Sequence, residues 1–121
     1  MDNEHKTTLL YACNGVSAYG QLTNEASHEL EDRDVGHVAC LAGVGAGIPS
    51  KIKAANEADR RIALDGCKLC CAKKILEKAG IKDIISIVAI ESGTRFSSER
   101  PTADETKQFS DYVVKRLQEE K

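Results

Sequence analysis

The sequence lacks tryptophan and has only five aromatic side chains, two Phe and three Tyr, in 121 residues. It has no long apolar run, and it has no excess of positive charge, because 17 Lys and Arg are matched by 19 Asp and Glu. Nucleic-acid-binding proteins need a basic surface, and single-strand binders add aromatic platforms. A membrane-spanning helix needs about 20 consecutive apolar residues. We therefore expect neither a nucleic acid nor a membrane among the partners.

The amino-terminal segment also lacks the order of a secretory signal, in which basic residues precede an apolar stretch. Residues 1–5 are polar and are predicted to form a disordered tail. Residues 6–121 are predicted to form a single α/β domain, which is long enough to bury a core. We expect a cytoplasmic protein, whose thiols stay reduced.

The sequence does contain five cysteines, an odd number that cannot all pair within one chain. In a reducing compartment, clustered cysteines are more often metal ligands or redox groups than structural disulfides. The cysteines are therefore the first candidates for a functional site.

Apolar, β-favouring runs alternate with segments of helical spacing along the chain. The expected strands are residues 7–13, 35–42, 62–64 and 84–90, and the expected helices are residues 20–31, 50–58, 68–79 and one that begins at a Thr102–Glu105 capping box. Such alternation predicts a three-layer αβα sandwich of Rossmann or flavodoxin type, with a four-stranded parallel sheet in the order 2-1-3-4. Residues 43–50, with three alternate glycines, are predicted to be irregular, with Ser50 capping the helix that follows.

Three cysteines follow three successive predicted strands. The interval from Cys13 to Cys40 and the interval from Cys40 to Cys67 are both 27 residues. Parallel strands end at the same edge of a sheet, which is where open α/β sheets bind ligands. Cys70 and Cys71 lie three and four residues after Cys67, so either shares a helical face with it. Four converging thiolates would suit one zinc ion per chain or an iron–sulfur centre.

Three segments, taken in order, resemble the DGC-domain family: residues 13–24, 40–45 and 65–74, of which the last begins with the Asp-Gly-Cys tripeptide. The resemblance implies a zinc site with the ligands Cys13, Cys40, Cys67 and Cys71, and it implies no particular reaction. The family motif has another residue where this chain has Cys70. Cys70 is therefore a possible substitute ligand or redox partner.

Four further residues are expected beside the thiols. Asp65 is predicted to accept hydrogen bonds from loop N–H groups. The alternative is that Asp65 hydrogen-bonds to a metal ligand or acts as an acid or base. Gly66, Gly43 and Gly45 are predicted to allow tight turns or a close approach to a ligand. No Gly-Lys-Ser/Thr follows these glycines, which excludes a P-loop.

The sequence favours a small zinc-binding protein whose biochemical role stays open, including whether it is an enzyme. The main alternative is a thiol oxidoreductase that uses the same cysteines, through Cys67 with Cys70 or Cys40 with Cys67. An iron–sulfur domain, and a domain with inert thiols that acts only through partners, are weaker alternatives. Beyond the metal ion, the partner is an unidentified small molecule or protein.

Overall fold

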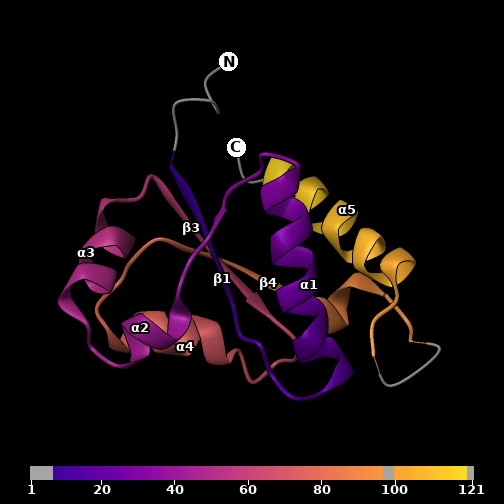
Figure 1. Cartoon of the computed structure of the whole chain (residues 1–121), viewed down its shortest axis with the longest axis horizontal. Coiled ribbons are helices and arrows are strands. Elements are labelled where there is room, and N and C mark those ends of the chain that lie inside the picture. Colours follow the sequence, from indigo (N-terminus) through magenta and orange to yellow (C-terminus); the bar gives the residue numbers. More distant parts are fainter. Residues whose placement is uncertain (1–6, 97–99, 120–121) are drawn as a thin grey trace.

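A parallel sheet lies between two layers of helices in the computed structural model, which describes residues 7–96 and 100–119 (Figure 1). The strands are β1 (Thr8–Ala12), β2 (His37–Val38), β3 (Arg60–Asp65) and β4 (Ile84–Val88). All pairings are parallel and the order is β2-β1-β3-β4. The predicted fold class and strand order are confirmed, while the predicted tail, residues 1–5, lies outside the described residues.

The helices divide between the two faces of the sheet. Helices α1 (Ala18–Asp32) and α5 (Ala103–Glu119) pack together on one face, and α2 (Leu41–Gly45), α3 (Pro49–Glu57) and α4 (Cys71–Lys78) lie on the other (Figure 1). A short 3-10 turn, η2 (Ala89–Ser92), follows β4. No helix within the described ranges combines the length and apolar character needed to cross a membrane.

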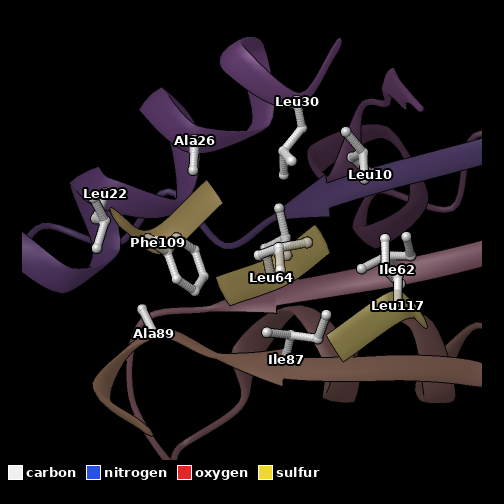
Figure 2. Close-up of a cluster of buried hydrophobic side chains, with 11 residues drawn as sticks. Leu10, Leu22, Ala26, Leu30, Ile62, Leu64, Ile87, Ala89, Phe109 and Leu117 are labelled. Atoms are coloured by element: carbon white, nitrogen blue, oxygen red, sulfur yellow. The ribbon is translucent and has the colours of Figure 1, made fainter. Parts of the chain in front are cut away.

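Side chains on the strands alternate between two buried clusters, because successive residues of a strand point to opposite faces. Leu10, Leu64 and Ile87 pack beneath α1 and α5, against side chains such as Leu22 and Phe109 (Figure 2). Their neighbours in the strands, among them Tyr11 and Ala63, belong to the cluster on the other face. Burying a leucine-sized side chain contributes roughly 1.5–3 kcal/mol, so both layers are held mainly by apolar burial.

Hydrogen-bonding side chains define the starts of the two long helices. The Ser17 hydroxyl accepts from the Gly20 N–H at 3.2 Å at the start of α1. Before α5, the Thr102 N–H donates to the Glu105 carboxylate at 2.8 Å, and the Glu105 N–H donates to the Thr102 hydroxyl at 3.2 Å. The predicted capping box is confirmed.

The segment around the alternate glycines differs from the prediction. β2 has only two residues, and Cys40 is then the N-cap of α2, which contains Gly43 and Gly45. Burial of Leu41 and Val44 in the core beside α4 outweighs the poor helix propensity of glycine. The prediction that residues 43–50 form no regular structure is therefore wrong.

Other predicted boundaries were wrong as well. Helix α4 begins at Cys71 rather than at residue 68, so Cys67 lies before the helix and does not share a helical face with Cys70 or Cys71. Ser50 lies inside α3, because Pro49 takes the first helical position and makes Ile48 the N-cap. The fourth strand ends at Val88 rather than at residue 90. Its first three residues are only half-buried, which fits the edge position that the predicted strand order also gives it.

Three glycines allow the start of α1 to lie against the end of β3. A Cβ built on Gly20 would lie 2.5 Å from the backbone of Gly15, and one on Gly66 would lie 2.7 Å from the Gly20 nitrogen. Real Cβ atoms do not approach other atoms so closely. This contact, hereafter the glycine contact, joins the loop after β1 to the loop after β3.

Gly20→Ala is expected to lower the free energy of unfolding by about 2–3 kcal/mol, because the added methyl group meets fixed backbone rather than a movable side chain. Gly45→Ala is the matched control, since its Cβ would be 3.4 Å from the Ile75 side chain and alanine favours helix. Denaturant unfolding of both variants tests this. Equal stabilities for the two variants would contradict the packing described.

Candidate metal and thiol site

All five cysteines lie at the carboxyl edge of the sheet, in the connections that follow three neighbouring strands. Cys13 directly follows β1, Cys40 lies between β2 and α2, and Cys67 comes two residues after β3. Cys70 is the N-cap of α4 and Cys71 is its first residue. The edge is therefore rich in thiols contributed by segments far apart in the sequence.

The Cys13 thiol is half-buried beside Thr23 of α1. Its sulfur lies 3.7 Å from the Thr23 hydroxyl oxygen, and its N–H donates to the Leu64 carbonyl at 2.9 Å. The Thr23 hydroxyl donates to the Gly20 carbonyl at 2.6 Å, so its proton is already engaged. The oxygen of Thr23 can therefore only accept from the thiol.

The Cys40 thiol is exposed and caps α2. Its sulfur accepts from the Gly43 N–H at 3.3 Å. A Cβ on Gly43 would lie 2.6 Å from the exposed Lys51 side chain, so a larger residue there would require that side chain to move. Burial raises the pKa of the nearby Tyr11 phenol. The positive charge of Arg61 acts to lower this pKa, and a Cys40 thiolate acts to raise it further.

The Asp65 carboxylate is buried at the end of β3 and caps α4. One oxygen accepts from the Ala72 N–H at 2.6 Å and the other from the Lys73 N–H at 3.2 Å. Burial raises the pKa of Asp65, while these two hydrogen bonds and the positive charges of Lys73 and Lys74 act to lower it. Asp65 thus fills the amino-terminal end of α4.

Cys67 and Cys70 are joined by a tight turn. The Cys70 N–H donates to the Cys67 carbonyl at 3.1 Å, and Cys70 has a left-handed φ of 54°. Burial, followed by the nearby Asp65 carboxylate, raises the pKa of the Cys70 thiol, and a hydrogen bond with Ser86 opposes that rise. Cys71, the next residue, is exposed.

The side chains stand apart at this edge. Within residues 7–96 and 100–119, no three His, Cys, Asp or Glu side chains lie close enough to hold one metal ion. Backbone hydrogen bonds do connect neighbouring parts of this edge. One joins Cys13 to Leu64 near the end of β3, and another joins Cys70 to Cys67 within their turn. The donor type suits zinc, but the thiols are not arranged around a common centre.

Sequence reasoning missed three residues that touch or influence the thiols. Ser86 is a polar residue in the middle of an apolar strand, a signal that could have been read. Thr23 lies at helical spacing on the buried side of α1, next to Leu22 and Ala26. Nothing in the sequence pattern distinguished Tyr11 from an ordinary core residue.

A family model described as "DGC domain" matches residues 9–113, nearly the whole chain. The chain belongs to the DGC-domain family. A curated relative in Pseudomonas aeruginosa PAO1, "Anaerobic and virulence modulator AnvM", is 32% identical over 87 residues. That match covers 72% of this chain and 66% of the relative, which is just under two thirds of the relative's length. No solved structure gives a significant match.

The pH dependence of stability tests the burial of Asp65 in this DGC domain. Its folded pKa is raised above the ordinary value of 3.8, so the folded state binds a proton at higher pH than the unfolded state. Between about pH 7 and about pH 4, wild type should gain stability relative to Asp65→Asn as the pH falls. Denaturant unfolding of both proteins across this range measures the difference, and a flat or opposite trend would contradict the assignment.

Proposed function

We propose that this DGC-domain protein binds one zinc ion through Cys13, Cys40, Cys67 and Cys71 and acts as a metal-responsive regulatory protein of the cytoplasm. The observation that carries the proposal is the placement of a cysteine after each of three adjacent parallel strands. Four thiolates are a common ligand set for Zn²⁺. An ion in this set would supply a fixed link between the loops.

The exposure of the thiols fits a site that closes around its ion. Cys40 and Cys71 are exposed, so their side chains can change rotamer without leaving a cavity in the core. Cys13 and Cys67 are half-buried nearer the sheet. We infer that the half-buried pair forms the base of the site and that the exposed pair completes it, which suits reversible binding.

The positive charge of α4 suits an anionic zinc–thiolate site at this edge of the sheet. Zinc with four thiolates carries a net charge of −2, which needs compensation. Lys73 and Lys74 of α4 are close enough to influence both the Asp65 carboxylate and the Cys70 thiol. These lysines would offset part of the negative charge of the site.

A regulatory role is favoured by the name of the Pseudomonas relative, which describes that protein as a modulator. Transfer of this role to the present chain is part of the proposal. A change in metal occupancy would alter how the three loops are held, and such a surface change is what a partner protein could read.

Zinc content and affinity of single Cys→Ser variants test the ligand set. Wild type should bind one zinc per chain, and Cys13→Ser, Cys40→Ser, Cys67→Ser and Cys71→Ser should each weaken binding at least about a hundredfold. Cys70→Ser is the matched control and should bind as wild type does. Competition with a zinc-chelating dye measures the affinities.

Two results would contradict this account. If the folded protein bound no zinc when zinc was supplied, the proposed function would be wrong. If the variants at positions 13, 40 and 67 bound zinc as tightly as wild type, the proposed ligand set would be wrong. Loss of zinc binding in Cys70→Ser, together with normal binding in Cys71→Ser, would make Cys70 rather than Cys71 the fourth ligand. The other three proposed ligands would be unaffected.

Thiol–disulfide exchange is the second candidate, and the Cys67–Cys70 turn favours it. A turn with this hydrogen bond holds its end Cα atoms within about 7 Å. A disulfide spans about 4.4–6.8 Å between Cα atoms. With glutathione disulfide as oxidant, the Cys67 thiolate would form a mixed disulfide and release one glutathione. Cys70 would then displace the second glutathione and close the protein disulfide.

Differential alkylation after treatment with glutathione disulfide tests this second candidate. Cys67 and Cys70 should become protected together, while the exposed Cys71 stays reactive toward the alkylating reagent. Cys70→Ser should instead retain a glutathione adduct, which mass spectrometry detects. If each of the five thiols reacted to the same extent before and after oxidation, thiol–disulfide exchange would be excluded.

A further inference from the structure

We propose that Ser86 is a positioning residue whose hydroxyl holds the Cys70 thiol toward β4, so that Cys71 rather than Cys70 completes the zinc site. The choice of Cys71 rests on the proposed zinc function, whereas the hold on Cys70 does not. Ser86 would thus decide which of two adjacent thiols is available to a metal ion.

Ser86 is the middle residue of β4 and faces the layer that contains α4. Its neighbours in the strand, Ile85 and Ile87, pack in the cluster beneath α1 and α5. Successive residues of a strand point to opposite faces, so the Ser86 side chain lies on the α4 side. The strand reads Ile-Ile-Ser-Ile-Val, and Ser86 is its one polar residue. A polar contact with the start of α4 accounts for a hydroxyl at this position.

The structure holds both the backbone and the thiol of Cys70. The thiol makes a hydrogen bond with the Ser86 side chain. The Cys70 N–H donates to the Cys67 carbonyl at 3.1 Å, and the Cys70 carbonyl accepts from the Lys74 N–H at 2.9 Å. The φ of 54° at Cys70 lies in the left-handed region, which residues with a side chain adopt only where their surroundings hold them there.

The sheet order gives the direction of the Cys70 thiol its meaning. β4 is an edge strand that pairs with β3, and β1 and β2 lie on the other side of β3. Cys13 follows β1 and Cys40 follows β2. The contact with Ser86 therefore directs Cys70 away from the two thiols with which a ligand would have to converge.

Cys71 is not held in this way. It is the first residue of α4 and its side chain is exposed. Within residues 7–96 and 100–119, no side-chain hydrogen bond restrains its thiol. A change of rotamer at Cys71 therefore breaks no contact, whereas recruiting Cys70 to the ion would break its hydrogen bond with Ser86.

Ser86→Val and Ser86→Thr form a matched pair of variants, because the two new side chains have the same shape and only threonine keeps the hydroxyl. In the metal-free protein, the Hα–Hβ couplings of Cys70, measured by NMR, report its χ1 rotamer. Wild type and Ser86→Thr should show one dominant rotamer. Ser86→Val should shift the couplings toward the average of several rotamers. Identical couplings in the two variants would overturn the proposal.

Zinc affinity in the Cys71→Ser background tests the choice of ligand. Adding Ser86→Val should tighten zinc binding at least about fivefold, because the released Cys70 supplies the missing thiolate without losing a hydrogen bond. Adding Ser86→Thr should leave the affinity unchanged, and adding Cys70→Ser to the Ser86→Val double variant should abolish the gain.

Equal zinc affinities of the two double variants would show that Ser86 does not select the ligand, and the proposal would be wrong. A wild type that binds no zinc would overturn the choice of Cys71 together with the proposed function. The NMR couplings of the metal-free protein would then decide by themselves whether Ser86 holds Cys70.

Discussion

The glycine contact is the constraint on which the thiol-rich edge depends. Gly20 lies against Gly15 and Gly66 so closely that no side chain fits between the backbones. This contact holds the start of α1 against the loop after β3, beside the point where the Cys13 N–H extends the β1–β3 pairing to the Leu64 carbonyl. Side chains of ordinary size would push the two loops apart and separate Cys13 from Cys67. The lack of side chains at Gly15, Gly20 and Gly66 thus allows the close backbone contact that positions the neighbouring residues.

The second determinant is the buried Asp65 carboxylate. Its two hydrogen bonds to the start of α4 occupy N–H groups that would otherwise face solvent or an anion. The cap fixes where α4 begins and therefore where Cys70 and Cys71 lie. Burial of this group has an energetic cost, which is reflected in its raised pKa. The Asp-Gly-Cys tripeptide thus combines a cap, a close backbone contact and a thiol in three residues.

Much of this organisation could be read from the sequence. Alternating strand and helix patterns were enough for the strand order, because right-handed connections leave few arrangements of four parallel strands. Equal intervals between Cys13, Cys40 and Cys67 were enough to locate all three at one edge. The α2 helix could not be predicted, since it forms through packing of Leu41 and Val44 despite two glycines. The side-chain arrangement of the thiols was also beyond the sequence, because it depends on rotamers and on neighbours such as Thr23 and Ser86.

Zinc K-edge X-ray absorption of the zinc-loaded protein tests the central claim most directly, because it reports the atoms bound to the ion. The proposed closure of the strand-end thiols around zinc predicts four sulfur ligands at about 2.3 Å. The Cys40→Ser variant should lose one of the four. A shell of nitrogen and oxygen ligands, or a sulfur count that is the same in both proteins, would contradict the account.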